Sequence, residues 1–215
     1  MNRTSIIQDI IDATKSLEYL EIGIEEGKNF NKIQCEYKVG VDPAFNQKHS
    51  IKSIGVKELN IKATSDCFFS DFQHISHRNS FDVVFIDGLH HAEQVMRDIF
   101  NCIKYGCNED CILVIHDCNP MKEIYQRREP VVNEWTGDVW KAWITLRSRL
   151  TYKSMFVVDC DFGVGVIENP RIANDLLTIN LDKYSYSDLE SNRNEMLNLK
   201  HEGHFKVWID QHVTL

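Results

Sequence analysis

Four carboxylates each lie at the end of a predicted buried strand: Glu21, Asp42, Asp87 and Asp117. In an open parallel sheet the carboxyl ends of the strands share one edge, and ligands bind there. Any one of these acids could instead cap a turn or a helix. Four acids at one edge repel one another unless something binds them. Their placement therefore predicts a ligand site at this edge.

A glycine turn follows the first of these strands, in the stretch Tyr19-Leu-Glu-Ile-Gly-Ile-Glu-Glu-Gly27. Glycines let the backbone approach a ligand closely, and a helix starting near Glu26 would offer free N–H groups to it. The spacing Glu-x-Gly-x-x-x-Gly differs from the dinucleotide fingerprint Gly-x-Gly-x-x-Gly. Glu21 would repel a pyrophosphate but suits a cofactor with a positive end. The turn therefore favours S-adenosylmethionine over a dinucleotide.

Two histidines lie close to the same predicted edge. His90 follows Asp87 by three residues, and His116 directly precedes Asp117. Histidine titrates near neutral pH, so both are candidate general bases. His90 could instead cap a helix or fill a purely structural position.

Strands and helices alternate along most of the chain. Apolar patterns predict strands at about 17–22, 35–41, 57–63, 81–86 and 111–115, and helices at about 4–16, from 26, from 65, at 92–105 and at 138–150. Leu59 and Ile61 are expected to point inward. Segments 155–158 and 163–167 predict a closing hairpin. The fold class is therefore α/β, a Rossmann-like doubly wound sheet, mostly parallel with an antiparallel C-terminal hairpin strand.

One domain is predicted over residues 1–168, with residues 1–16 as an N-terminal helix. Residues 169–215 change character and are expected to form an extension packed on the same domain. Ser187 and Glu190 have capping-box spacing, which predicts a helix to about His201 that stops at Gly203.

Composition excludes several classes of protein. The chain has 215 residues, of which 43% are hydrophobic and 26% charged, and its formal net charge is −8. Such a charge disfavours nucleic acid as a partner. No apolar run approaches the length of a membrane span, and the N-terminal stretch is no signal peptide. The seven scattered cysteines, among them Cys107 and Cys111, predict reduced thiols in a cytoplasmic protein.

A long loop, residues 118–137, leaves the last parallel strand and could cover the site. The helix after it begins with Asp138, a favourable charge at that position, but Lys141 is disfavoured in a first turn. Lys141, with Arg127 or Arg128, is therefore predicted to bind an anionic acceptor. Alternatively, Lys141 simply extends into solvent.

Three motifs carry a family resemblance over residues 19 to about 168. They are Phe81-Asp-Val-Val-Phe-Ile-Asp-Gly-Leu-His90, His116-Asp-Cys-Asn-Pro120 and Gly137-Asp-Val-Trp-Lys141. With the glycine turn, they resemble class I S-adenosylmethionine-dependent methyltransferases. The Asp-Gly-x-His string resembles a subgroup with many sugar and natural-product O-methyltransferases.

This resemblance implies roles for individual residues. The methionine and ribose part of the cofactor would lie against the first turn, namely Glu21, Gly23, Glu25 and Gly27. Asp42 would accept both ribose hydroxyls. The adenine would lie beside Ser65 and Asp66, and the methyl group beside Asp87. The catalytic residues would be His90, His116 and Asp117.

The resemblance leaves a divalent metal open. Some relatives bind one with acids where this chain has Asp87 and Asp117, and such oxygen ligands suit Mg²⁺. Relatives with a clear metal site usually carry two adjacent acidic or amide ligands where this chain has Asp117-Cys118, or an acid in place of His116. These departures weigh against a metal.

The expected function is O-methylation of a sugar or another small hydroxylated, including anionic, acceptor, for example in a surface polysaccharide. The alternatives are N-methylation of a small amine or amino alcohol phosphate, and a catalytically silent binding domain. A nicotinamide-dependent enzyme is disfavoured by the glycine spacing. The expected partner is a small-molecule or glycan acceptor, and a homodimer is left open.

Overall fold

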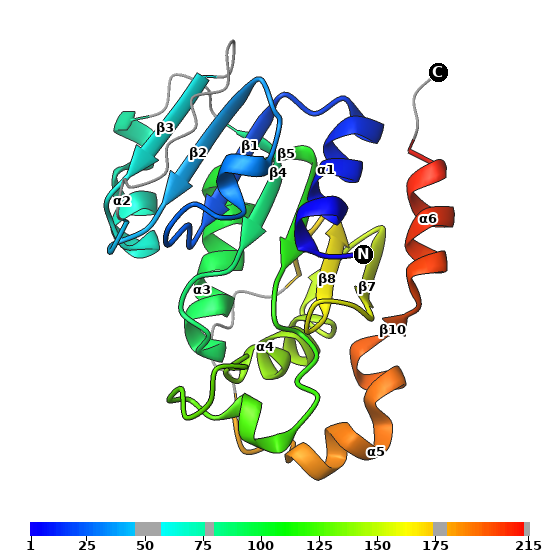
Figure 1. The fold of residues 1–215 in the computed structure, drawn as a ribbon. Coiled ribbons are helices and arrows are strands. Elements are labelled where there is room, and N and C mark those ends of the chain that lie inside the picture. The colour runs from blue at the N-terminus through cyan, green and yellow to red at the C-terminus, as the bar shows by residue number, and fades with distance from the viewer. Residues whose placement is uncertain (46–56, 76–79, 174–179, 213–215) are drawn as a thin grey trace.

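A single eight-stranded sheet runs through the molecule (Figure 1). This computed structural model describes residues 1–45, 57–75, 80–173 and 180–212. The strand order is β10-β7-β8-β5-β4-β1-β2-β3. The strands are β1 (Glu18–Ile22), β2 (Tyr37–Val41), β3 (Lys57–Ile61), β4 (Phe81–Ile86), β5 (Cys107–Ile115), β7 (Ser154–Val158), β8 (Val164–Glu168) and β10 (Leu199–Lys200).

The sheet is parallel except at β8, which pairs antiparallel with both β5 and β7. This confirms the predicted Rossmann-like α/β class and the hairpin strand. A separate two-stranded sheet pairs β6 (Leu150–Thr151) with β9 (Arg171–Ile172). The central strands are buried on both faces, as their continuous apolar runs predict.

Register aligns the strand ends that matter for function. Ile22 pairs with Ile86, and Ile86 pairs with Ile115. The residues that follow, Gly23, Asp87 and His116, therefore leave the sheet at one level. Two backbone hydrogen bonds fix this arrangement. The Asp87 N–H donates to the Ile22 carbonyl at 2.8 Å, and the His116 N–H donates to the Ile86 carbonyl at 3.0 Å.

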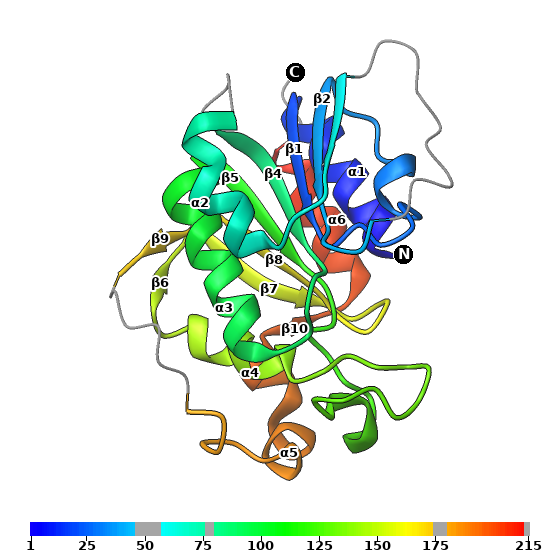
Figure 2. The same ribbon diagram turned by 90° about the vertical axis from the view of Figure 1, so that its left-hand side faces the viewer.

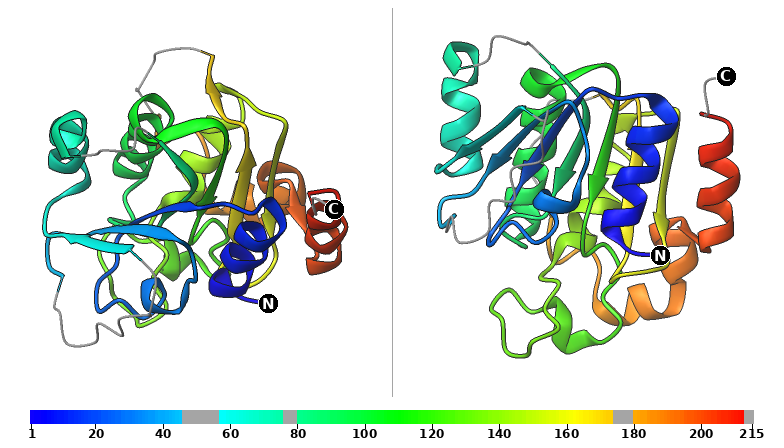
Figure 3. Two further views of the ribbon diagram at one scale, coloured as in Figure 1. Left: turned by 90° about the horizontal axis from the view of Figure 1, so that it is seen from above. Right: turned by 45° about the horizontal axis from the view of Figure 1, so that its top comes forward.

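Helices cover both faces of the sheet (Figure 2). One face packs against α2 (Ser65–Ile75), α3 (Ala92–Asn101), α4 (Val139–Leu146) and α5 (Tyr186–Leu197). The other packs against α1 (Arg3–Thr14) and α6 (Glu202–Asp210), which lie side by side (Figure 3). The N-terminal ammonium lies 2.9 Å from Glu202 and ties the two helices together. Within the described residues, no helix is long and apolar enough to cross a membrane.

The predictions for the segment after Gly27 and for Leu59 were wrong. No α-helix follows Gly27; a single 3-10 turn, η1 (Phe30–Lys32), forms instead. Asn29 explains this, because its amide donates to Glu21 at 3.0 Å and accepts from Thr4 at 2.7 Å, in place of continuing a helix. Leu59 is 39% exposed, because β3 is the edge strand of the sheet.

The C-terminal extension packs on the same sheet through β10 and α6, although residues 174–179 and 213–215 of it lie outside the described part. The capping box of α5 is formed by Ser185 and Asp188, two residues before the predicted pair. The helix ends at Leu197, with Asn198 in a left-handed conformation. Gly203 lies in the first turn of α6 and stops no helix.

The cysteines differ from the prediction in one respect. The structure joins Cys107 and Cys111 at the start of β5 as a disulfide, whereas the sequence predicted seven reduced thiols. The other five cysteines are free.

Candidate active site

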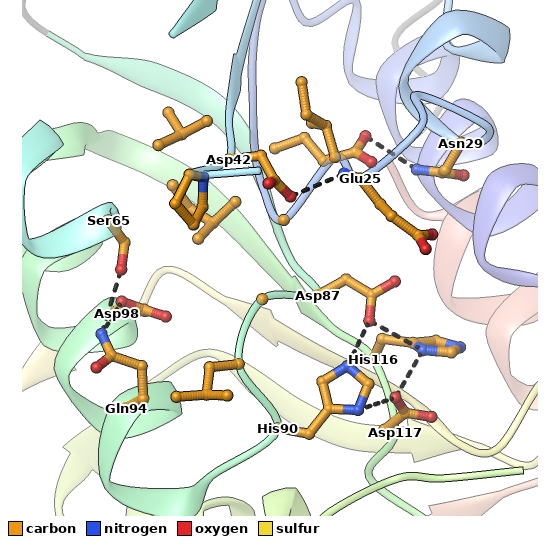
Figure 4. A pocket seen from close by; sticks show the side chains of 18 of the residues that line it. Glu25, Asn29, Asp42, Ser65, Asp87, His90, Gln94, Asp98, His116 and Asp117 are labelled. Carbon is orange, nitrogen blue, oxygen red and sulfur yellow. Dashed lines mark hydrogen bonds and ion pairs between the residues drawn. The ribbon is translucent and has the colours of Figure 1, made fainter. Parts of the chain in front are cut away.

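A cavity of about 840 Å³ opens at the carboxyl ends of β1, β2, β4 and β5 (Figure 4). It is lined by all the predicted cofactor and catalytic residues except Gly27, namely Glu21, Gly23, Glu25, Asp42, Ser65, Asp66, Asp87, His90, His116 and Asp117. The strand-end acids therefore lie together at one edge of the sheet, as their positions in the sequence predicted. Arg127, Arg128 and Lys141 do not line this cavity.

The turn after β1 requires glycine at its first position. Gly23 has φ +89°, and a Cβ there would lie 2.1 Å from the carbonyl oxygen of Asp87. The two turns after β1 and β4 are therefore in direct backbone contact. Gly27 also has a positive φ, of +77°, and a Cβ there would lie 2.7 Å from Asn31. Gly27 thus shapes the turn from outside the cavity.

Asp42 stabilises the same turn from the end of β2. One carboxylate oxygen accepts from the Glu25 N–H at 2.8 Å, and the other accepts from the Ala44 N–H at 2.7 Å. Glu25 has φ +45°, an uncommon conformation that this hydrogen bond helps to maintain. Each carboxylate oxygen has further lone pairs, so Asp42 can still accept from a ligand in the cavity.

Glu21 is 1% exposed at the base of the cavity. Its carboxyl accepts from the Tyr19 hydroxyl at 2.6 Å and from Asn29 at 3.0 Å. Burial raises the pKa of Glu21 to about 8, although these two hydrogen bonds act against the rise. Burial therefore favours the protonated carboxyl at neutral pH, and a cationic group beside it would favour its ionised form.

A second polar group lies at the α2–α3 side of the cavity. The Gln94 amide donates to Ser65 at 3.2 Å and to Asp98 at 2.9 Å. Asp98 is 1% exposed, and burial raises its pKa to about 6. Asp66 lies farther out, half exposed and 3.6 Å from Arg97.

Two histidines and two aspartates form a cluster at the ends of β4 and β5 (Figure 4). Nδ1 of His116 lies 3.3 Å from Asp87 and 3.2 Å from Asp117. His90 lies 3.4 Å from Asp87 and 3.2 Å from Asp117. The ring of His90 also stacks on Trp135, with 4.7 Å between the ring centroids.

These neighbours shift the titration of the whole cluster. Burial alone would raise the pKa of Asp87, but His116 and His90 bring it well below its usual range. Burial lowers the pKa of His90, but Asp87 and Asp117 raise it by more. The pKa of His90 is therefore above its ordinary value. The same balance raises the pKa of His116. The two histidines can thus carry a positive charge that the acids stabilise.

Arg3 also reaches this cluster, from α1. Its Nη1 lies 2.7 Å from Nε2 of His116. A guanidinium can only donate hydrogen bonds, so Arg3 opposes protonation of that ring nitrogen. Asp161, in the turn between β7 and β8, lies 3.6 Å from the same nitrogen.

Backbone conformations that are rare for their residue types support the cluster. Asp117, Asp161 and Phe162 have φ of 60°, 47° and 60°. The turn at Phe162 pairs with the end of β5, since its carbonyl accepts from the Asn119 N–H at 2.7 Å. Such conformations concentrate at functional sites. Phe162 and Trp135 give the cavity aromatic walls.

The predicted acceptor-binding cations lie in a second depression, of about 440 Å³, beside α4. Arg128 is paired with Glu93 at 3.0 Å and with Asp138 at 2.7 Å. Lys141 donates to the Leu181 carbonyl at 2.6 Å. Lys141 was predicted to bind an anionic acceptor, but it lies outside the main cavity and anchors the C-terminal extension.

The candidate metal ligands do not fit Mg²⁺. Ligand atoms of Asp87, His116 and Asp117 lie within 4.8 Å of one another. Mg²⁺ prefers an all-oxygen shell, whereas His116 lies between the two carboxylates and Arg3 adds a fixed positive charge beside it. We therefore derive no chemical step through a metal.

Several residues of the site carried no sequence signal of their own. They are Arg3, Asn29, Gln94 and Phe162. Phe162 lies in a loop, where no periodic pattern exists. Two others had a signal: Asp98 lies in the Arg97-Asp98 pair that follows the Asp-Gly-x-His string and belongs to the family resemblance, and Trp135 lies in the loop predicted to cover the site.

Comparison with known proteins finds a likeness over the first half of the chain. Residues 20–118 match a family model described as a methyltransferase domain. No curated protein sequence matches the chain.

Three solved structures illustrate the likeness in fold. An O-methyltransferase from Bacillus cereus in complex with S-adenosylhomocysteine is 12% identical with a TM-score of 0.54, over 78% of this chain and 80% of that one. The O-methyltransferase TomG from Streptomyces achromogenes, in complex with S-adenosylmethionine, is 11% identical with a TM-score of 0.53, over 80% of each chain. The N-methyltransferase NodS from Bradyrhizobium japonicum is 16% identical with a TM-score of 0.51, over 78% and 94%. These matches show that the chain shares its fold with methyltransferases, and the family model describes a methyltransferase domain over residues 20–118.

Proposed function

We propose that this methyltransferase domain transfers the methyl group of S-adenosylmethionine to a hydroxyl oxygen of a small acceptor, such as a sugar or another hydroxylated compound. One observation carries the proposal. A single cavity joins the turn stabilised by Asp42 to the cluster of His90, His116 and Asp117. A cofactor bound at the first would place its methyl group toward the second.

The cofactor would extend across the strand ends. Asp42 would accept from the ribose hydroxyls with its remaining lone pairs. Ser65, Gln94 and Asp98 would face the adenine. The ammonium group of the methionine end would lie near Glu21, where it would favour the ionised carboxylate despite burial.

The chemistry requires alignment and one proton transfer. The sulfonium is already activated, so the acceptor oxygen must be placed in line with the methyl carbon. The oxygen lone pair forms the new C–O bond as the S–CH₃ bond breaks, and the sulfur keeps that electron pair. His90 in its neutral form would take the hydroxyl proton on a ring nitrogen, and Asp87 and Asp117 would stabilise the imidazolium that results.

The histidine cluster favours an oxygen acceptor over a nitrogen one. A neutral amine attacks with its own lone pair, whereas an alcohol must lose a proton in or near the transition state. The aromatic walls formed by Trp135 and Phe162 suit the apolar face of a sugar ring. A role in surface polysaccharide synthesis rests on the family resemblance alone.

A methyl-transfer screen tests the proposal. Purified protein with labelled S-adenosylmethionine would be offered nucleotide sugars, sugar phosphates and small amino alcohols, with and without Mg²⁺. We expect transfer to at least one hydroxylated compound, without a need for Mg²⁺. Transfer to amines alone would favour the N-methyltransferase alternative. Cofactor binding without any transfer would favour a silent binding domain.

A further inference from the structure

The side chain of Arg3 lies inside the cofactor cavity, although the residue belongs to the first turn of α1. Its Nη1 contacts His116 at 2.7 Å, and its Nε lies 3.9 Å from Asp87. Within the described residues, Nε and Nη2 donate no hydrogen bond. Most of the donor capacity of this guanidinium is therefore available to a ligand.

The position of Arg3 is built into the fold. Its backbone N–H donates to Asp161 at 2.9 Å, and the capping box of Asn2 and Ser5 fixes the start of α1. Four buried isoleucines attach the helix to the sheet: Ile6, Ile7, Ile10 and Ile11. The helix α6 lies beside α1 (Figures 1 and 3), and its Glu202 anchors the ammonium group of Met1.

Charges in the cavity are strongly unbalanced. Its acidic residues are Glu21, Glu25, Asp42, Asp66, Asp87, Asp98, Asp117 and Glu134. The permanently charged cations among the lining residues are Arg3 and Lys28, and Lys28 is 75% exposed and paired with Glu26. Burial raises the pKa of Glu21, and the charge of Arg3 acts against that rise, so its field reaches the base of the cavity.

S-adenosylmethionine carries a sulfonium, an ammonium and a carboxylate. The acids of the cavity suit the two cationic groups, but they repel the carboxylate. A planar guanidinium can bind a carboxylate with two parallel N–H···O bonds. Arg3 is half-buried on the side of the cavity where His116 lies, and its guanidinium can make such a pair of parallel hydrogen bonds there.

We propose that Arg3 binds a ligand carboxylate in this cavity, namely the one at the methionine end of the cofactor. The inference rests on the proposed function, because that function supplies the ligand. An anionic group of the acceptor offers the same chemistry, and the experiment separates these two sources.

The test compares two ligands by calorimetry: S-adenosylhomocysteine, which has the amino acid end, and 5′-methylthioadenosine, which lacks it. Arg3→Gln should weaken S-adenosylhomocysteine about tenfold or more and leave 5′-methylthioadenosine within about twofold. Arg3→Lys keeps the positive charge but cannot make two parallel hydrogen bonds. Its affinity for S-adenosylhomocysteine should lie between those of wild type and Arg3→Gln. Lys206→Gln, an exposed change on α6, removes the same charge outside the cavity and should change neither affinity.

A third titration uses protein that is already saturated with S-adenosylhomocysteine. D-glucuronate, which carries a carboxylate, and D-glucose, which does not, are added to it separately. Loss of glucuronate binding in Arg3→Gln, with both nucleoside affinities unchanged, would assign Arg3 to an acceptor anion instead. No change in any arm, in a variant whose melting temperature matches wild type, would overturn the inference. Failure of wild type to bind either nucleoside would instead overturn the proposed function.

Discussion

Buried carboxylates occur at both edges of the sheet, but their surroundings differ. At the edge away from the cavity, Glu168 is 4% exposed and has a full set of partners. It accepts from Trp208 at 3.2 Å and from His212 at 2.9 Å, and Lys153 lies 2.6 Å away. At the cavity edge, burial raises the pKa of Glu21 to about 8 and that of Asp98 to about 6.

The comparison separates two uses of a buried acid. Glu168 joins β8 to α6 and the residues after it, and its donors offset the cost of burial. Glu21 and Asp98 lack such compensation, which is costly for folding and useful for binding a cationic ligand. Substitution of Glu168 should therefore lower stability and leave ligand binding unchanged. Substitution of an acid in the cavity should weaken ligand binding or raise the stability of the ligand-free protein.

The largest expected effect is on catalysis at the cavity edge. His90→Ala should lower kcat about 10²–10⁴-fold, because it removes the base that Asp87 and Asp117 orient. Steady-state kinetics with the acceptor found by the screen would measure this. His91→Ala, a change at the neighbouring histidine, should retain most activity. Full activity in His90→Ala would move the role of base to His116.

The next effect is on cofactor affinity. Asp42→Ala should weaken S-adenosylhomocysteine at least about tenfold, because hydrogen bonds to a charged group contribute roughly 1.5–3 kcal/mol. Calorimetry would measure the affinity, with the exposed Glu190→Ala as the control. An unchanged affinity in a folded Asp42 variant would remove Asp42 from the site.

At the opposite edge, Glu168→Gln should lower the free energy of unfolding by about 1–3 kcal/mol at pH 7 without changing cofactor affinity. Burial would raise the pKa of Glu168, but His212 and Lys153 lower it overall. The stabilisation is thus present above the unfolded pKa of the carboxyl and is lost as pH falls through the folded one. Urea unfolding at pH 7 and at pH 3 would show the difference shrinking in acid. Equal stability at pH 7 would mean that Glu168 is not a structural anchor.

The smallest effect has the opposite sign. Asp98→Asn should raise the free energy of unfolding of the cofactor-free protein at pH 8 by about 1 kcal/mol. A two-unit rise in the pKa of Asp98 corresponds to roughly 3 kcal/mol, which sets an upper limit on this gain. Burial raises the folded pKa to about 6, so wild type loses stability as pH rises through that value and the variant does not. The two proteins should converge near pH 4. A variant that is less stable at pH 8 would contradict the comparison between the two edges.

The sequence revealed the cavity acids because their positions follow from strand periodicity. Asp87 and Asp117 each come directly or almost directly after an apolar run, and the sheet topology brings such ends together. Arg3 could not be predicted this way, because its side chain reaches the cavity only through the docking of α1 on the sheet. The contact of Lys141 could not be predicted for the same reason, because its partner, Leu181, lies 40 positions along the chain.

The short 3-10 turn after Gly27 shows another limit. The sequence predicted a helix from the glycine turn, but Asn29 bonds to Glu21 and to Thr4 of α1. Asparagine side chains compete with helix formation wherever such partners are near, and the partners become known only from the fold. The disulfide of Cys107 and Cys111 likewise depends on the local path of the chain at the start of β5.

The central claim is that the acidic edge binds S-adenosylmethionine. The most direct test titrates the protein with S-adenosylhomocysteine and, separately, with NAD in a calorimeter. We predict saturable binding of S-adenosylhomocysteine with one site per chain, and no heat of binding with NAD. Binding of NAD without binding of S-adenosylhomocysteine would contradict the assignment of the cavity.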